Sequence, residues 1–317
     1  MTDLLKNPIF KDETKAREWL EARVWPEGPT CPHCGNADAG KIKALQGKAH
    51  RPGLYQCAEC REQFTVTVKT VFERSKIPLT KWLAALFLMT ASKKGVSAHQ
   101  VHRMLGISYK STWFMMHRLR EAMRVSGLVP MGGAGKVVEA DEAYIGKVDE
   151  PRVSAQRKGR PYKSRKHIGM KQTVVALVER SGSVRSFHVA VADAANVAAI
   201  VNDNIHHQTR LHTDESKLYT KIGAQFAAHE TVNHGAREYA RGDVTTNTVE
   251  SYFSIFNRGM RGTYQHCAEK HLHRYLAEFD FRHNNRMALG VNDAMRAETL
   301  AAGIAGKRLT YRRPNQA

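Results

Sequence analysis

Two Cys-x-x-Cys pairs near the N-terminus constrain the fold of this chain more than any other feature. Cys31 and Cys34 form the first pair, and Cys57 and Cys60 form the second pair after residues 35–56. Four thiolates at this spacing suit one tetrahedral Zn²⁺ ion, and so small a ribbon buries too little apolar surface to fold without it. The alternative is a redox role, for which one pair would be enough. We predict one structural Zn²⁺ bound by the four cysteines.

The charge of the chain indicates the kind of partner it binds. Its 317 residues include 49 Lys and Arg against 30 Asp and Glu, a formal net charge of +19. Such a charge favours a polyanion such as nucleic acid. Double-stranded DNA is the partner we expect from the helix-turn-helix layout described below. The alternative is a basic protein whose charge only keeps it in solution. No apolar run approaches the ~20 residues of a membrane span, and the N-terminus lacks a signal-peptide pattern, so we expect a cytoplasmic protein without membrane contact.

Changes in pattern along the chain predict a multidomain α+β protein. A Gly- and Pro-rich segment at 126–135 separates helical patterns from mixed strands and helices. Within the helical part we expect Thr80 to cap one helix, and alternation at 64–68 predicts a strand that ends the ribbon. The predicted parts are an N-terminal helix and zinc ribbon (1–74), a helical domain (75–127), a mixed α/β domain (136–290) and a loose basic tail (291–317).

Residues 97–123 have the layout of a helix-turn-helix. A short helix starts at Ser97 and stops at Gly106, and a longer helix follows. In this layout the second helix enters the major groove of DNA, which makes Lys110, Arg118 and Arg120 candidate contacts. The alternative is a plain three-helix bundle with no DNA role.

Three acidic residues lie where a carboxylate needs a partner. Asp141 falls inside the apolar strand pattern of 137–146, Asp214 ends a short strand, and Glu250 lies on a helix beside a buried stripe. A buried carboxylate is costly unless it is paired or binds a metal. Acids from two strands and one helix can converge on hard cations, and we predict two Mg²⁺ or Mn²⁺ ions. The alternative is that the three acids have these positions by chance, because the chain has 30 Asp and Glu residues.

Six stretches give the sequence a family resemblance. The chain resembles bacterial insertion-sequence transposases of the DDE class that carry an N-terminal zinc ribbon. The matching stretches follow the family's order from about residue 20 to 290: "WPEGPTCPHCG", "FERSKIPLTKW", "VEADEAYIG", "LHTDESKLY", "TNTVESYFSIFNRGMRGTYQH" and "KHLHRYLAEFDFRHNNR". The resemblance implies a ribonuclease H-like α/β catalytic domain, in which a mixed sheet has helices on its faces.

The resemblance also implies roles for single residues. It gives Asp141, Asp214 and Glu250 as the catalytic, metal-binding acids, with Asn247 as a rival for the third position. Relatives often have a basic residue where Asn257 stands. The expected phosphate contacts are therefore Arg258 and Arg261, together with Arg157, Lys158 and Arg160 of a basic loop.

The implied activity is DNA transposition. A strand is cut at each transposon end, and the freed 3′-hydroxyl then attacks a phosphodiester of target DNA. Bringing two ends together implies a homodimer or a larger assembly. Two alternatives stay open on the residues alone: a zinc-ribbon and helix-turn-helix regulator without catalysis, and a nuclease that only hydrolyses DNA.

Overall fold

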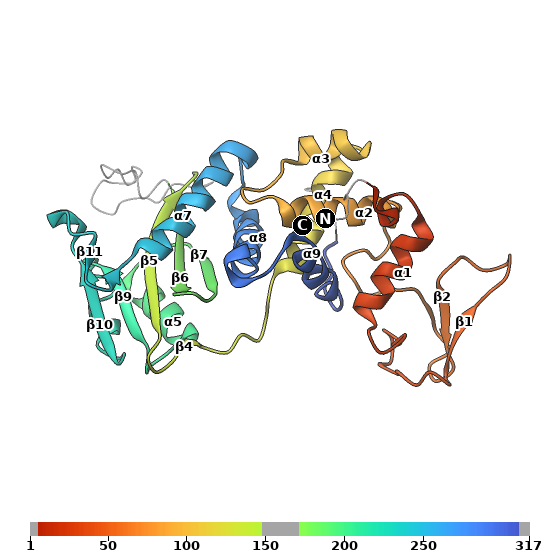
Figure 1. Ribbon diagram of the computed structural model, residues 1–317, viewed down its shortest axis with the longest axis horizontal. Coiled ribbons are helices and arrows are strands. Elements are labelled where there is room, and N and C mark those ends of the chain that lie inside the picture. The colour runs from red at the N-terminus through yellow and green to blue at the C-terminus, as the bar shows by residue number, and fades with distance from the viewer. Residues whose placement is uncertain (1–5, 148–170, 311–317) are drawn as a thin grey trace, which may run out of the picture. The chain divides into compact units, whose positions relative to one another are not determined.

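The computed structural model describes residues 6–147 and 171–310, which fall into two compact units (Figure 1). The N-terminal unit comprises Met1–Ser92, Val96–Met123 and Val291–Ala317. The sheet unit comprises Lys93–Gly95 and Arg124–Gly290. The ribbon and the helical domain, which the sequence suggests are separate, thus form one unit, and the chain returns to that unit at its C-terminal end.

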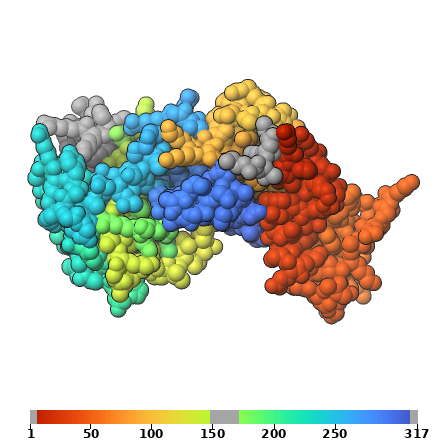
Figure 2. All heavy atoms as spheres, viewed as in Figure 1, coloured from red at the N-terminus to blue at the C-terminus, as the bar shows by residue number. Residues whose placement is uncertain are grey.

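A helix and a three-stranded ribbon open the N-terminal unit. Helix α1 (Glu13–Val24) starts after Asp12, whose carboxylate accepts hydrogen bonds from two backbone N–H groups of the first turn. The strands β1 (Ile42–Leu45), β2 (Leu54–Cys57) and β3 (Gln63–Phe64) pair antiparallel in that order. The loop between β1 and β2 projects from the ribbon (Figure 2). The strand predicted over 64–68 is wrong beyond Phe64, because Val68 donates its N–H to Thr65 in a local turn.

Helices α2 (Leu79–Ala91), α3 (Ala98–Leu105) and α4 (Tyr109–Met123) form the helical part. Ser97 caps α3 and Gly106 ends it in the left-handed conformation, as predicted. The predicted cap of α2 by Thr80 is wrong. The Glu13 carboxylate, 66 positions earlier in the chain, instead accepts hydrogen bonds from Leu79 N (2.7 Å) and Thr80 N (3.2 Å).

The first part of the predicted tail, up to residue 302, is folded, while residues 311–317 lie outside the described residues. Residues Asp293–Ala302 form α9, which contacts α1 and α2. Leu300 and Ala301 of this helix are buried, and Arg23 of α1 forms an ion pair with Glu298 at 2.7 Å. The apolar side of α9 therefore helps to form the core of the N-terminal unit.

A five-stranded mixed sheet forms the centre of the sheet unit. Its order is β10-β9-β5-β6-β7, in which β5–β6 and β6–β7 pair antiparallel while β5–β9 and β9–β10 pair parallel. The strands are β5 (Val137–Ile145), β6 (Gln172–Glu179), β7 (Val184–Val189), β9 (Arg210–Asp214) and β10 (Ala228–Val232). Two short pairs add β4 (Met131–Gly132) with β8 (Ile205–His206), and β11 (Ala240–Arg241) with β12 (Val244–Thr245).

Helices cover both faces of this sheet. Helices α7 (Asn247–Gly259) and α8 (Leu272–Asn284) pack on one face through a cluster that includes Ile145, Val249 and Phe279. Helices α5 (Ala194–Asn204) and α6 (Thr220–Gly223) pack through a cluster that includes Val138, Leu211 and Val201. A mixed sheet between helices is the ribonuclease H-like architecture, so this prediction is confirmed. Within the described residues, none of the helices has the length and apolarity to span a membrane.

Candidate metal centre and acidic site

The four predicted zinc ligands lie together in the ribbon. All four Sγ atoms, those of Cys31, Cys34, Cys57 and Cys60, lie within 4.8 Å of one another. The Sγ atoms of Cys31 and Cys60 are 3.6 Å apart and those of Cys34 and Cys57 are 3.7 Å apart. These distances are far too long for disulfides and match the ~3.8 Å between thiolates on one tetrahedral Zn²⁺ ion. The donor set fits the predicted structural Zn²⁺.

The first two acids project from neighbouring parallel strands at the same level. The last paired positions of β5 and β9 are Glu139 and His212. Asp141 and Asp214 each lie two residues further along, and side chains alternate between faces along a strand. Both carboxylates therefore extend from the face of the sheet that α7 covers, and Glu250 lies in the first turn of α7.

Burial and neighbouring charges both raise the pKa of Asp141. Burial, and then the nearby carboxylates of Glu142, Asp214 and Glu250, raise the pKa of Asp141 to about 8. Burial also raises the pKa of Asp214, with smaller contributions from Glu215 and Glu250. The three predicted acids therefore lie close enough to interact electrostatically, and a cation among them would relieve the cost of ionising them.

The surroundings of Glu250 distinguish it from Asn247. Thr246 Oγ1 donates a hydrogen bond to Glu250 Oε1 at 2.7 Å, and His234 Nε2 lies 3.5 Å from the same oxygen. Asn247 is exposed, whereas the charge of the half-buried Glu250 contributes to the raised pKa values of Asp141 and Asp214. His234, which follows β10, has no signal in the sequence that would mark it as a neighbour of these acids.

The acids suit a hard cation by their chemistry. A set of carboxylates with a largely buried Asp141 is the kind of donor group that Mg²⁺ or Mn²⁺ prefers. Among the described residues, however, the four cysteines are the one group of three or more Cys, His, Asp or Glu gathered closely enough for a single ion.

The structure divides the predicted DNA contacts into two groups. Lys110, Arg258 and Arg261 are exposed, and Asn257, which precedes Arg258 on α7, is half-buried. Arg118 and Arg120 are only 6% and 2% exposed, so their prediction as phosphate contacts is wrong. Arg118 instead donates a hydrogen bond to the backbone oxygen of Glu73 at 2.6 Å, which holds it in the helical core. The contacts predicted at Arg157, Lys158 and Arg160 lie outside the described residues.

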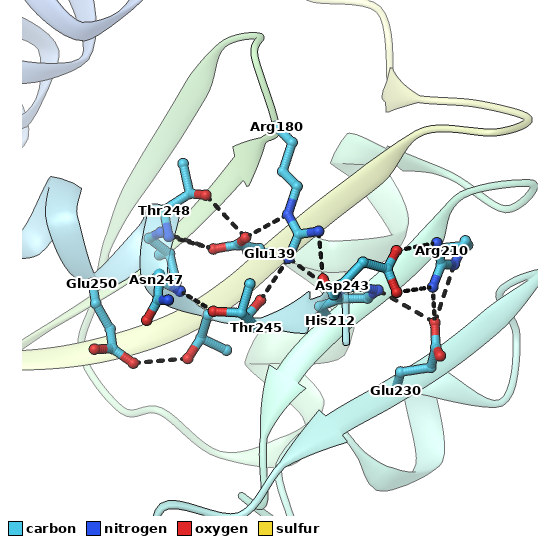
Figure 3. A network of polar contacts seen from close by, with 12 residues as sticks. Glu139, Arg180, Arg210, His212, Glu230, Asp243, Thr245, Asn247, Thr248 and Glu250 are labelled. Carbon is cyan, nitrogen blue, oxygen red and sulfur yellow. Dashed lines mark hydrogen bonds and ion pairs between the residues drawn. The ribbon is translucent and has the colours of Figure 1, made fainter. Parts of the chain in front are cut away.

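A second buried carboxylate lies beside the predicted site. Glu139 shares its strand face with Asp141 and is fully buried. It accepts hydrogen bonds from Arg180 and from the first turn of α7, as Figure 3 shows. On the opposite face, Glu142 accepts a hydrogen bond from the buried Tyr219 at 3.0 Å. Alternation along the strand places Glu139 beside Asp141, but nothing in the sequence reveals what it binds.

Solved structures with some likeness include a strand transfer complex and a viral intasome. A chain described as the Mos1 strand transfer complex is 14% identical with a TM-score of 0.29, covering 72% of this chain and 76% of that chain. A chain of a simian T-cell lymphotropic virus intasome is 12% identical with a TM-score of 0.29, covering 57% of this chain and 63% of that one. TM-scores this low support no argument about the present chain.

Sequence comparisons carry more weight. A protein of Halobacterium salinarum, described as an uncharacterized protein in transposable element ISH50, is 26% identical over 288 residues, 86% of this chain and 91% of that protein. Residues 132–284 match the model of the ISXO2-like transposase domain, and residues 11–63 match the transposase zinc-ribbon domain. The first match covers the mixed sheet with all three acids, and the second covers the four cysteines. These matches support a DNA transposase, with an ISXO2-like transposase domain over the mixed sheet and an N-terminal transposase zinc ribbon over the cysteines.

Proposed function

We propose that this transposase cuts DNA strands at the ends of an insertion sequence and joins the freed 3′-hydroxyl to target DNA. Asp141, Asp214 and Glu250 form its catalytic site and bind two Mg²⁺ or Mn²⁺ ions. The observation that supports this most is the pKa of Asp141, raised to about 8 by burial and by the other carboxylates around it. A carboxyl group in that position is ionised at neutral pH only with a cation to balance it.

Each acid has a distinct structural support. Asp141 and Asp214 lie on adjacent strands of one sheet, which fixes their separation. Glu250 is held from the other side by α7 and by the hydroxyl of Thr246. Bound divalent ions would supply charge stabilisation at the phosphate and lower the cost of generating an oxygen nucleophile. The protein's part is to hold the three carboxylates in place on rigid strands and a helix, so that the site reorganises little during the reaction.

The DNA is held by positive charge outside this site. Lys110, Arg258 and Arg261 are exposed and available to phosphates, and the basic segment with Arg157, Lys158 and Arg160 would add to them. Phosphate contacts position a protein on DNA without reading its sequence, so the zinc ribbon and the α3–α4 pair are the proposed readers of the transposon ends. Bringing two ends together would take at least two copies of the chain.

The test is strand cleavage and strand joining with DNA carrying the ends of the element. Asp141→Asn, Asp214→Asn and Glu250→Gln should each abolish cleavage while DNA binding, measured by filter retention, stays within about twofold of wild type, because charge loss at one site is small against +19. Asp203→Asn is the matched control, because Asp203 is an exposed acid of α5. It should cleave like the wild type.

Three outcomes would redirect the proposal. Undiminished cleavage by Glu250→Gln would shift the third position to Asn247. A wild-type protein that cuts DNA but never joins a pre-cut end to plasmid DNA would be a nuclease. A protein that binds the ends without cutting them in Mg²⁺ or Mn²⁺ would be a DNA-binding regulator.

A further inference from the structure

Glu139 is a buried carboxylate that the proposed reaction does not use. It lies on β5 two residues before Asp141, on the same face of the strand, and its side chain is 0% exposed. Burying a carboxylate is costly unless every lone pair is satisfied, so its contacts indicate why it is there.

Both oxygens of Glu139 are satisfied, and three of the four donors come from the start of α7. Oε2 accepts the backbone N–H groups of Thr248 at 2.7 Å and Val249 at 3.0 Å. Oε1 accepts the Thr248 hydroxyl at 2.9 Å and Arg180 Nε at 2.8 Å. Figure 3 shows the carboxylate between Thr248 and Arg180. Glu250, the next residue after Val249, is the proposed third acid.

Local side chains cap only part of the start of α7, where the Thr245 hydroxyl accepts a hydrogen bond from Asn247 N at 3.0 Å. Thr246, at the N-cap position, makes no side-chain capping bond, and its hydroxyl instead donates to Glu250 Oε1. A helix N-terminus needs an acceptor for its free N–H groups and favours negative charge. Glu139 supplies both from the central strand, 109 positions earlier in the chain.

Arg180 extends this attachment to the segment that enters α7. Its guanidinium donates to the backbone oxygens of Asp243 at 2.6 Å and Thr245 at 3.1 Å, while its Nε donates to Glu139. Its Nη2 also lies 3.2 Å from Nδ1 of His212, which is level with Glu139 on β9. The same small network thus contacts both acid-bearing strands and the acid-bearing helix (Figure 3).

We propose that Glu139 is a positioning residue that caps α7 from β5 and thereby sets the Glu250 carboxylate opposite Asp141 for metal binding. The proposal rests on the function proposed above for the three acids. The simpler alternative is that Glu139 and Arg180 form a buried ion pair that only adds stability to the sheet unit.

The experiment compares Glu139→Gln with Asp280→Asn in the full-length, zinc-loaded protein. Asp280 also holds α7, because it accepts a hydrogen bond from Tyr252 at 2.6 Å, and it too is bonded to a strand, through Ser186 N at 2.9 Å. It does not touch the first turn that carries Glu250. Both variants exchange a carboxylate for an amide, so a loss of general stability should appear in both.

The main measurement is Mn²⁺ affinity by electron paramagnetic resonance, with DNA absent. Glu139→Gln should weaken binding at least about tenfold, the usual cost of losing a residue that orients a metal ligand. The Mn²⁺ affinity of Asp280→Asn should stay within about twofold of wild type, while its Tm falls at least as far as the Tm of Glu139→Gln. Thr248→Val, which removes one of the four donors and keeps both backbone bonds, should fold normally and weaken Mn²⁺ binding by about threefold.

Each result bears on the proposal separately from the function on which it rests. Unchanged Mn²⁺ affinity in Glu139→Gln, or an equal loss in Asp280→Asn, would overturn the positioning role even if the wild type binds Mn²⁺ and cleaves DNA. Wild-type Mn²⁺ binding that Asp141→Asn does not reduce would instead refute the metal site itself, and the positioning role with it.

Discussion

Exposure decides what each positive side chain in this chain does. Arg118 lies on the same helix as Lys110, yet its guanidinium is buried, donates to Glu73 O and lies 5.5 Å from the ring centroid of Trp82. Burial also lowers the pKa of Arg118. A cation held in this way stabilises the helical core through its hydrogen bond and its contact with an aromatic face. Lys110, Arg258 and Arg261 have their charges at the surface, where phosphates can reach them.

Substitution of Arg118 should therefore mainly change stability, whereas substitution of Lys110 should mainly change DNA binding. Arg118→Met should lower the free energy of unfolding by about 1–3 kcal/mol, because a buried backbone oxygen loses a charged donor. Lys110→Met should cost less stability than Arg118→Met, because Lys110 is exposed, and it should reduce the slope of log K against log salt by about one, because one phosphate contact is lost. Urea unfolding and DNA binding between low and moderate salt measure the two effects. A reduced salt slope in a fully stable Arg118→Met protein would contradict the assignment.

At the scale of elements, α7 is the helix on which the proposed site depends most. It is attached to the sheet at its first turn through Glu139, and one turn later through Tyr252, which donates to Asp280 of α8. Asp280 also accepts from the hydroxyl and the backbone N–H of Ser186 on β7, at 2.7 and 2.9 Å. These two polar attachments lie between apolar contacts. They fix the position of α7 along its axis and its rotation about that axis, and apolar packing alone would leave both less specific.

The Asp280 attachment should make stability depend on pH. Burial raises the pKa of Asp280 to about 7, from 3.8 in an unfolded chain. Between these values the folded state binds more protons than the unfolded state, so the unfolding free energy falls as pH rises from about 4 to 7 and then levels off. The stability of the wild type relative to Asp280→Asn should decrease across this range. Thermal unfolding of both proteins at several pH values measures it, and a constant difference would refute the role of Asp280.

Helix α9 offers a second test at this scale. Leu300 is 1% exposed in the core of the N-terminal unit, so Leu300→Ala should cost about 2–5 kcal/mol of stability. Met295 of the same helix is 44% exposed, and Met295→Ala should cost little. Urea unfolding monitored by tryptophan fluorescence distinguishes them. Equal and small effects would mean that this segment is a tail after all.

At the scale of the whole molecule, the chain divides its tasks between two compact units. The N-terminal unit contains the zinc ribbon and the α3–α4 pair, and the sheet unit contains all three proposed catalytic acids. Each unit has its own apolar core, so each can lose structure without the other.

Removing zinc should therefore affect one unit only. The energy of Zn²⁺ binding in small ribbons is largely their folding energy, about 10 kcal/mol or more in zinc-finger peptides. A strong chelator should abolish amide protection in β1 and β2 while β5 and β6 keep theirs, as hydrogen exchange would measure. Added Zn²⁺ should restore protection, and Cys57→Ser should mimic the chelator. Loss of protection in β5 at the same rate as in β1 would contradict independent units.

The sequence by itself determined the features that rest on neighbouring residues. The cysteine spacing, the cap at Ser97, the stop at Gly106 and the buried stripe of Val249, Phe253 and Phe256 all depend on residues within a few positions of one another. The acids Asp141, Asp214 and Glu250 were also identifiable, because each stands out locally and their order matches a known family pattern. The mixed sheet was implied by the family resemblance, and the order of strand and helix patterns in the sequence is compatible with it.

Only the tertiary structure decided which distant groups meet. Glu13 caps α2, Glu139 caps α7, Arg118 is buried and α9 completes a core at the other end of the chain. Each of these contacts joins residues tens to hundreds of positions apart, and a local pattern contains no record of them. A charged side chain has the same signature in the sequence whether it faces water or a backbone carbonyl, and packing alone sets its environment.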